Sequence, residues 1–226
     1  AVKAKYGVTI DQPWLDHVRG ASLRLSTGCS ASIVSGQGLV LTNHHCVSDC
    51  VTGLSTSDKD YIKDGYLAAD RREEKLCPGM QAESLEAITD VTGAVAAATN
   101  GLTGEAIVRA RSAAVAKIES DACAGRATTH NCQVVSLYQG GQNKLYVFRK
   151  YSDVRIVFAP EFQTAFFGGD PDNFNFPRFA LDAAFLRVYE NGKPASTPSF
   201  LRWTPRAPKP GEIGRASCRE RVYHPV

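Results

Sequence analysis

The sequence lacks three features that would decide its class at once: a long apolar run, a large excess of one charge, and a Cys-x-x-Cys motif. Its apolar runs are far shorter than the ~20 residues of a membrane-spanning helix, so we expect no membrane span. The formal net charge is only +3, too small for a nucleic-acid-binding surface, so we expect no nucleic-acid partner. Of its 226 residues, 43% are hydrophobic and 22% charged, values typical of a globular protein and not of a disordered chain.

Seven cysteines are many for a reduced cytosolic protein of this length. Since no Cys-x-x-Cys spacing indicates a thiol redox site, we expect disulfides and an oxidising compartment, periplasmic or secreted. The predicted pairs are Cys29 with Cys46, Cys50 with Cys77, and Cys123 with Cys132. The alternative is zinc bound by the His and Cys cluster of residues 44–50, but no second ligand pair follows at short spacing. We therefore expect no metal and no cofactor.

Short β-strands dominate the predicted secondary structure. Short or alternating apolar runs, bounded by Gly, Pro and Asn turns, predict strands. They are Ser22–Leu25, Ala31–Val34, Leu39–Thr42, Gln133–Tyr138, Lys144–Tyr151, Val154–Phe158 and Ala183–Tyr189. Apolar residues at three- and four-residue steps predict an amphipathic helix over 104–125, and residues 57–76 have a polar, helical character. We expect a mainly antiparallel β fold, a barrel rather than a sandwich, with a helical insertion over about residues 82–126.

The two ends of the chain are interpreted separately. Ala1–Tyr6 is not apolar, so the chain begins without a signal peptide, which we expect processing or fragmentation to have removed. Residues 1–211 are predicted to form the N-terminal part of the domain. Residues 212–226 lack β periodicity and carry Cys218, which has no partner among the predicted pairs. We interpret this tail as a foreign reading frame, with a native disordered tail as the alternative.

The first informative motif surrounds two adjacent histidines. Residues 39–46 read LVLTNHHC, and Cys29 lies 17 positions before Cys46. The pattern resembles the catalytic-histidine region of chymotrypsin-fold serine peptidases, in which a disulfide links a strand to the residue after the catalytic base. This resemblance implies that His45 is the general base, that His44 is structural, and that a Cys29–Cys46 disulfide tethers the site. A tether suits a base that must lie within ~3 Å of a hydroxyl group.

A second motif narrows the resemblance. Residues 168–178 read GGDPDNFNFPR, and an Asp follows four positions later. Together the two motifs resemble serine peptidase family 46, the bacterial dipeptidyl-peptidases of types 7 and 11, which combine a chymotrypsin-like double barrel with a helical domain. The resemblance implies that Asp182 is the catalytic carboxylate and that Asn173 and Phe174 bind the free amino terminus of a substrate. An ammonium group has three donors and no acceptor, so the amide oxygen of Asn173 suits it.

Structural interpretations of the second motif stay open: Asn173 could be a turn residue and Phe174 a core aromatic. The motif also departs from the family, which often has Trp at positions 174 and 176 and His-Thr-Gly at 179–181. Asp170 and Asp172 do not fit a calcium loop, because Phe174 stands where that loop needs Asp or Asn.

The nucleophile that this resemblance requires is missing. The chymotrypsin fold orders its triad His, Asp, Ser, yet no Gly-x-Ser-Gly follows Asp182, and Ser196, Ser199 and Ser217 lack flanking glycines on both sides. The resemblance covers about residues 5–205, equivalent to the first of two barrels. We expect a serine exopeptidase that removes dipeptides from oligopeptides with a free N-terminus, and a chain that is inactive alone. The alternatives are a chymotrypsin-like endopeptidase and a non-catalytic, disulfide-stabilised β-barrel binding module. A homodimer also stays open.

Overall fold

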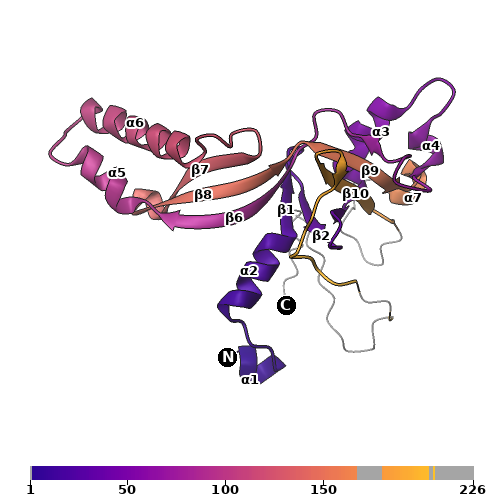
Figure 1. Ribbon diagram of the computed structural model, residues 1–226, viewed down its shortest axis with the longest axis horizontal. Helices are drawn as coiled ribbons and strands as arrows, with labels where there is room; N and C mark the ends of the chain where they lie inside the picture. Colours follow the sequence, from indigo (N-terminus) through magenta and orange to yellow (C-terminus); the bar gives the residue numbers. More distant parts are fainter. Residues whose placement is uncertain (1, 167–179, 204–205, 207–226) are drawn as a thin grey trace. The chain divides into compact units, whose positions relative to one another are not determined.

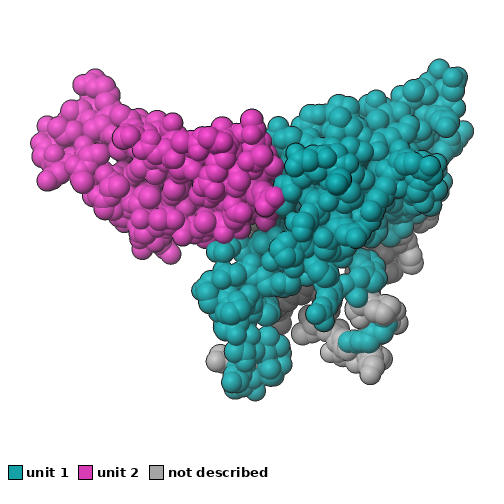
Figure 2. Space-filling view, in the orientation of Figure 1, with its two compact units in different colours: residues 1–82, 151–226 teal, residues 83–150 magenta. Residues whose placement is uncertain are grey.

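The structure, a computed structural model, describes residues 2–166, 180–203 and 206 (Figure 1). Two compact units are present: Ala1–Ala82 with Tyr151–Val226 form the first unit, and Glu83–Lys150 form the second (Figure 2). The predicted tail, residues 212–226, lies outside the described residues, as do Asn173 and Phe174. The predicted domain boundaries therefore stay predictions.

Antiparallel strands form the first unit, in the order β4-β9-β10-β3-β2-β1, with β5 on β9 and β11 on β10. Within the described residues, these strands form an open sheet. The predicted antiparallel β class is thus confirmed. The strands are β1 (Ser22–Leu25), β2 (Ser30–Ile33), β3 (Leu39–Thr42), β4 (Tyr66–Leu67), β5 (Lys75–Leu76), β9 (Asp153–Ala159), β10 (Ala184–Glu190) and β11 (Lys193–Pro194).

The helices of the first unit are short, and most lie in the connections between strands (Figure 1). The longest, α2, starts where the Asp11 side chain accepts a hydrogen bond from the amide of Trp14 at 3.0 Å, an N-cap that satisfies one of the helix's unpaired amides. The helices are α1 (Val2–Tyr6), α2 (Gln12–Ala21), η1 (His44–Val47), α3 (Ser48–Leu54), α4 (Tyr61–Asp64) and α7 (Phe162–Ala165).

The helical character predicted for residues 57–76 is largely wrong. Only the single turn α4 is helical there, and β4 and β5 occupy the rest. Gly65 ends the turn in a left-handed conformation, with φ at +71°. A Cβ at this position would meet the amide nitrogen of Glu161 at 2.9 Å, so the chain requires glycine and cannot continue as a helix.

Alternating side chains of four strands form the core of the first unit. Ile33 of β2, Val40 of β3, Ile156 of β9 and Leu186 of β10 are each at most 2% exposed. Burying an aliphatic side chain of this kind contributes about 1.5–3 kcal/mol. This packing holds β3 and β10 in a fixed antiparallel register, in which Thr42 lies opposite Ala184. The end of β3 therefore lies beside the start of β10.

A buried ion pair further fixes β10. The Arg187 guanidinium donates to both oxygens of Glu74, at 2.9 and 3.1 Å, and to the Gln37 carbonyl at 2.9 Å. The Tyr189 hydroxyl donates to the same carboxylate at 2.6 Å. Burial, together with the adjacent Glu74 carboxylate, raises the pKa of Tyr189 to about 12, so the hydroxyl stays a donor at neutral pH.

The second unit contains the strands β6 (Ala82–Asp90), β8 (Gln142–Tyr151) and β7 (His130–Leu137), in that order across the sheet. Its helices are α5 (Thr92–Thr99) and α6 (Glu105–Ala122), and a 3₁₀ turn, η2 (Tyr138–Gly140), precedes β8. The helix predicted over 104–125 is confirmed as α6. The insertion predicted to be helical from about residue 82 begins instead with the nine-residue strand β6.

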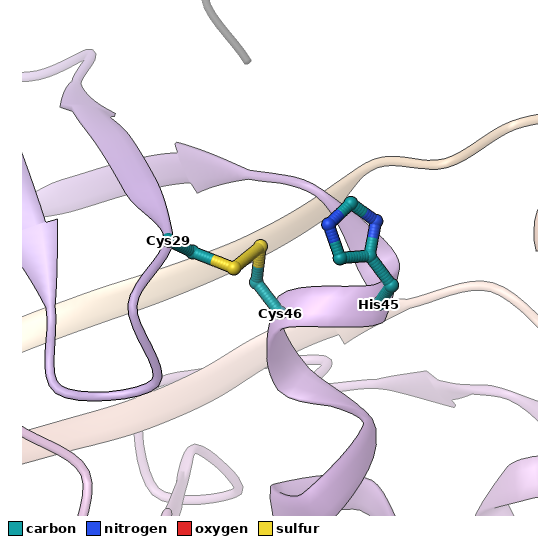
Figure 3. A group of neighbouring side chains, drawn as sticks. All are labelled: Cys29, His45 and Cys46. Carbon is teal, nitrogen blue, oxygen red and sulfur yellow. A yellow bond between two sulfur atoms is a disulfide. The ribbon is translucent and has the colours of Figure 1, made fainter. Parts of the chain in front are cut away.

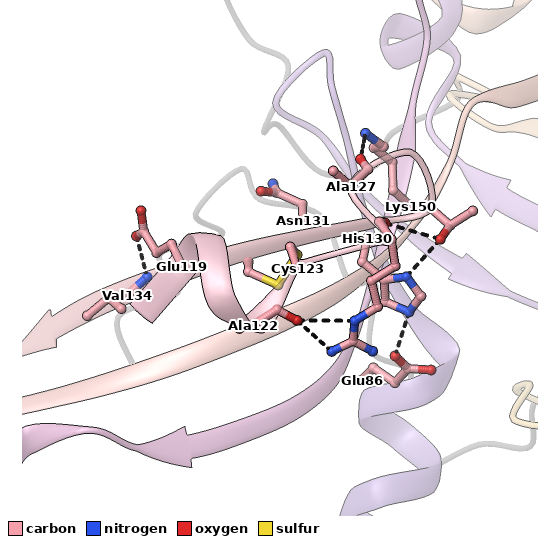
Figure 4. Close-up of a disulfide and its surroundings, with 12 residues drawn as sticks. Glu86, Glu119, Ala122, Cys123, Ala127, His130, Asn131, Val134 and Lys150 are labelled. Atoms are coloured by element: carbon pink, nitrogen blue, oxygen red, sulfur yellow. Dashed lines mark hydrogen bonds and ion pairs between the residues drawn. A yellow bond between two sulfur atoms is a disulfide. The ribbon is translucent and has the colours of Figure 1, made fainter. Parts of the chain in front are cut away.

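All three predicted disulfides are present. Cys123–Cys132 links the end of α6 to β7, and the Glu119 carboxylate in the last turns of α6 accepts from the amide of Val134 at 2.7 Å (Figure 4). Nearby, the ring Nε2 of His130 lies 3.1 Å from Glu86 on β6. Among the residues that the structure describes, no helix is long and apolar enough to cross a membrane.

Candidate active site

The candidate site forms where β3 ends and β10 begins. Because Thr42 pairs with Ala184, the residues after β3 lie opposite the residues before β10. The chain leaves β3 through Asn43 and enters the 3₁₀ turn η1, which carries His45. Asp182 approaches from the other side, two residues before β10. One edge of the sheet thus brings together two residues that lie 137 positions apart in the sequence.

The side chains of His45 and Asp182 are in direct contact. Nδ1 of His45 lies 2.8 Å from Oδ2 of Asp182, and the backbone amide of His45 donates to Oδ1 at 3.1 Å. The carboxylate thereby holds the Nδ1–H tautomer and leaves Nε2 as the basic atom of the ring. The His45 side chain is 42% exposed and that of Asp182 only 12%. An accessible base is therefore oriented by a shielded carboxylate.

Asn43 also contacts this carboxylate. Its Nδ2 donates to Oδ2 of Asp182 and to the backbone carbonyl of Asp182, both at 3.1 Å. Sequence reasoning did not identify this residue, because an Asn directly before a helical turn has an ordinary role as a helix cap. Only the pairing of β3 with β10 indicates the contact.

Hydrogen bonding keeps Asp182 ionised. Burial raises the pKa of Asp182, but the hydrogen bonds from the His45 amide and ring, and then that from Asn43, outweigh it. The net pKa lies below the ordinary value for an aspartate. The carboxylate therefore carries its negative charge at neutral pH, which is the condition for stabilising an imidazolium.

His44 has the structural environment predicted for it. Its side chain is buried, and its ring packs against Phe162 with centroids 6.4 Å apart. Burial lowers the pKa of His44, outweighing the opposing effects of the Asp182 carboxylate and the Pro160 carbonyl. Its Nε2 has no hydrogen-bond partner among the described residues. A neutral, buried ring of this kind anchors η1 to the segment before α7.

The Cys29–Cys46 disulfide lies beside the His45 ring, as Figure 3 shows. One ligand atom from each of these residues falls within 4.8 Å of the others, a spacing that could suit a metal ion. Both sulfurs are bonded to each other, however, and Cys50 is bonded to Cys77. Zinc binds thiolates, so the donor set does not fit the zinc alternative, and the disulfide acts as a tether.

The remaining residues considered in the sequence are the predicted substrate-binding residues and the three serines that follow Asp182. Asn173 and Phe174 lie outside the described residues, as does Ser217. Ser199 packs against Gly20 at the end of α2. Ser196 follows Ala195, whose amide donates to the carbonyl of Val188 in β10.

Comparisons with known proteins identify the family of this chain. The model of the family described as Peptidase S46 matches residues 1–215. Dipeptidyl-peptidase 7 of Porphyromonas gingivalis is 36% identical over 168 residues, covering 72% of this chain and 23% of the relative. An Asp/Glu-specific dipeptidyl-peptidase of Porphyromonas endodontalis is 34% identical over 187 residues, covering 79% of this chain and 26% of the relative.

A solved structure matches as well. The crystal structure of Porphyromonas endodontalis DPP11 in complex with the dipeptide Arg-Glu has a TM-score of 0.68 and 30% sequence identity. The match covers 81% of this chain and 28% of that chain. The sequence thus spans about a quarter of the length of the relatives that it matches. The chain belongs to the peptidase S46 family.

Proposed function

We propose that the protein containing this chain is a serine-type exopeptidase that removes dipeptides from the free N-terminus of oligopeptides. His45 acts as the general base and Asp182 orients it. The observation that carries the proposal is the 2.8 Å contact between Nδ1 of an accessible His45 and a shielded Asp182 carboxylate. The family supports the reaction class, since its relatives are named dipeptidyl-peptidases.

In this mechanism, Nε2 of His45 takes the proton of a serine hydroxyl as its oxygen attacks the carbonyl carbon of the second peptide bond. Asp182 stabilises the imidazolium that forms. The imidazolium then protonates the leaving amine, and water, deprotonated by the same base, releases the dipeptide from the acyl-enzyme. The serine is proposed to come from a part of the protein outside this chain, so the 226-residue chain is expected to be inactive alone.

Exopeptidase specificity requires recognition of the substrate's ammonium group. We assign this role to Asn173, whose amide oxygen can accept from the ammonium, with Phe174 packing against the dipeptide. Relatives of this chain have been solved with dipeptides, Arg-Glu and Arg-Asp in the case of DPP11, which supports a dipeptide-sized site. Three disulfides support an oxidising location, the periplasm or the cell exterior.

The test uses protein expressed from the complete coding sequence and a set of dipeptidyl-arylamides. His45→Ala is expected to abolish release of the arylamine, and Asp182→Asn to lower kcat by about 10⁴-fold because it favours the wrong tautomer. His130→Ala is the matched control, since His130 also contacts a carboxylate, Glu86, at 3.1 Å but lies in the second unit. Retained cleavage in the folded His45→Ala variant refutes the proposal.

A second comparison separates exopeptidase from endopeptidase. A free N-terminus is expected to be required, so N-acetylated peptides of the same sequence should not be cleaved. Asn173→Ala should raise KM for free peptides, because the ammonium loses its acceptor. Equal cleavage of acetylated and free peptides indicates an endopeptidase instead, and a folded complete protein that cleaves neither indicates a binding module.

A further inference from the structure

Asn43 occupies a helix N-cap position but does not cap the helix. It precedes η1 in an extended conformation, with φ at −82° and ψ at 154°, the geometry in which an Asn side chain usually accepts from an amide of the first turn. No such side-chain hydrogen bond forms here. The side chain instead turns toward the start of β10. Instead of capping η1, the Asn43 side chain forms hydrogen bonds with Asp182, across the sheet.

The contact across the sheet uses the donor end of the amide. Nδ2 of Asn43 lies 3.1 Å from both Oδ2 and the main-chain oxygen of Asp182. Both of these atoms can only accept hydrogen bonds while the carboxyl is ionised, so the NH₂ group, not the amide oxygen, must face them. The two bonds hold the side chain and the backbone of Asp182 at once.

The same oxygen of Asp182 also accepts a hydrogen bond from the His45 ring. Oδ2 accepts from Nδ1 of His45 at 2.8 Å and from Nδ2 of Asn43 at 3.1 Å, while Oδ1 accepts from the His45 amide. A carboxylate oxygen has two lone pairs. With Asn43 on one of them, the other is directed at the ring, which fixes the plane of the carboxylate and the direction of its bond to Nδ1.

We infer that Asn43 is a positioning residue for catalysis: it holds the Asp182 carboxylate in the orientation that keeps His45 ready to accept a proton. The inference rests on the proposed function and extends it by one residue. The side-chain hydrogen bonds of Asn43 go to Asp182, so Asn43 acts through that residue. Among the described residues, the titratable groups coupled to Asp182 are His45 and His44.

Two substitutions separate this role from helix capping. Asp is as good an N-cap residue as Asn, so if Asn43 merely supported η1, Asn43→Asp would be harmless and Asn43→Ala the damaging change. If Asn43 instead serves as a donor to Asp182, Asn43→Asp is the more damaging of the two substitutions. Asn43→Asp then places a second carboxylate beside the first, whereas Asn43→Ala only removes the hydrogen bonds.

The first measurement uses the 226-residue chain and needs no activity. The carboxyl carbon of Asp182 is titrated by ¹³C NMR in each variant. We expect the pKa of Asp182 to rise in Asn43→Ala and to rise further in Asn43→Asp, because a stabilising donor is lost and then replaced by a like charge. The matched control is Asn131→Ala, which removes an equivalent amide donor to a carboxylate, from Nδ2 to Glu83 at 2.9 Å, in the second unit. An Asp182 titration that moves no more than in this control overturns the inference.

The second measurement uses the complete enzyme and dipeptidyl-arylamides. Loss of a hydrogen bond to a charged group predicts that kcat falls about 10- to 100-fold in Asn43→Ala with KM little changed, and further in Asn43→Asp. A purely structural role predicts instead that Asn43→Asp retains the native kcat, which overturns the inference. If the native complete protein releases no dipeptide, the proposed function fails, and the NMR titration still decides whether Asn43 controls Asp182.

Discussion

Removal of the Cys29–Cys46 disulfide is expected to destabilise the first unit by about 3 kcal/mol through chain entropy alone, given a sequence separation of 17 residues. In the double variant Cys29→Ala, Cys46→Ala, the core also loses a buried sulfur, since Cys46 is 3% exposed. That loss adds about 1 kcal/mol. The expected total is therefore about 4 kcal/mol, a large fraction of the stability of a typical domain.

Loop length alone does not distinguish this disulfide from the others. The entropic contribution grows only with the logarithm of loop size, so Cys123–Cys132, with a separation of 9, is expected to differ from it by less than about 1 kcal/mol. The two disulfides differ instead in where they lie in the fold. Cys29–Cys46 joins the residue before β2 to the turn that carries His45, whereas Cys123–Cys132 lies wholly within the second unit.

Native-state hydrogen exchange resolves the difference by position. In the Cys29–Cys46 variant, the opening free energy of amides in β2 and β3 should fall by about 3–4 kcal/mol. The control variant, Cys123→Ala, Cys132→Ala, should lower the protection of β7 amides more than that of β3 amides. A loss below about 1 kcal/mol in β3 of the first variant contradicts the account of the disulfide as the tether of the site.

Other predictions concern the buried charges of the first unit. Glu74→Gln should destabilise the chain by about 3–5 kcal/mol in urea unfolding, because it leaves the Arg187 guanidinium buried without a counter-charge. The exposed-pair control, Asp70→Asn, should leave the unfolding midpoint unchanged, and equal effects would contradict the prediction. His44 has a lowered pKa in the folded state, so the unfolded state binds the proton first and stability falls as pH drops below 6.5. His44→Asn, measured by urea unfolding over a pH series, should flatten this slope, and an unchanged slope would count against a neutral buried ring. Asp182 has a lowered pKa, so its contribution is present above pH 3.8 and is lost as the pH falls through the folded-state value; Asp182→Asn should remove this acid-dependent part of the unfolding free energy.

The strands of the first unit could be predicted because their signal is local. β1 and β3 have the predicted boundaries, since one face of each is buried and the apolar alternation shows it directly. β6 was missed because its buried side chains at the start, Ala82 and Ser84, are small, and its remaining residues include helix-forming Ala, Glu and Leu. In β6, sheet pairing outweighs intrinsic propensity.

Some residues of the candidate site could likewise be predicted from the sequence, and others could not. His45 and Asp182 could be identified from motifs, because each is embedded in a distinctive run of residues. Asn43 could not, since its identity alone fits an ordinary helix cap and its actual partner depends on the pairing of β3 with β10. The buried Glu74–Arg187 pair was missed for the same reason, as its members lie 113 positions apart.

The arrangement of the base and its carboxylate is a local property of the first unit. The residues that hold the pair together lie directly after β3, on η1, directly before β10 and in the disulfide to Cys29, all within that unit. An oriented general base acts on whichever hydroxyl reaches its exposed edge, and a base fixed before the encounter loses little further freedom in the transition state. The His45–Asp182 geometry should therefore be detectable in the isolated 226-residue chain, by the NMR signals of a hydrogen-bonded Nδ1–H, before any nucleophile is supplied.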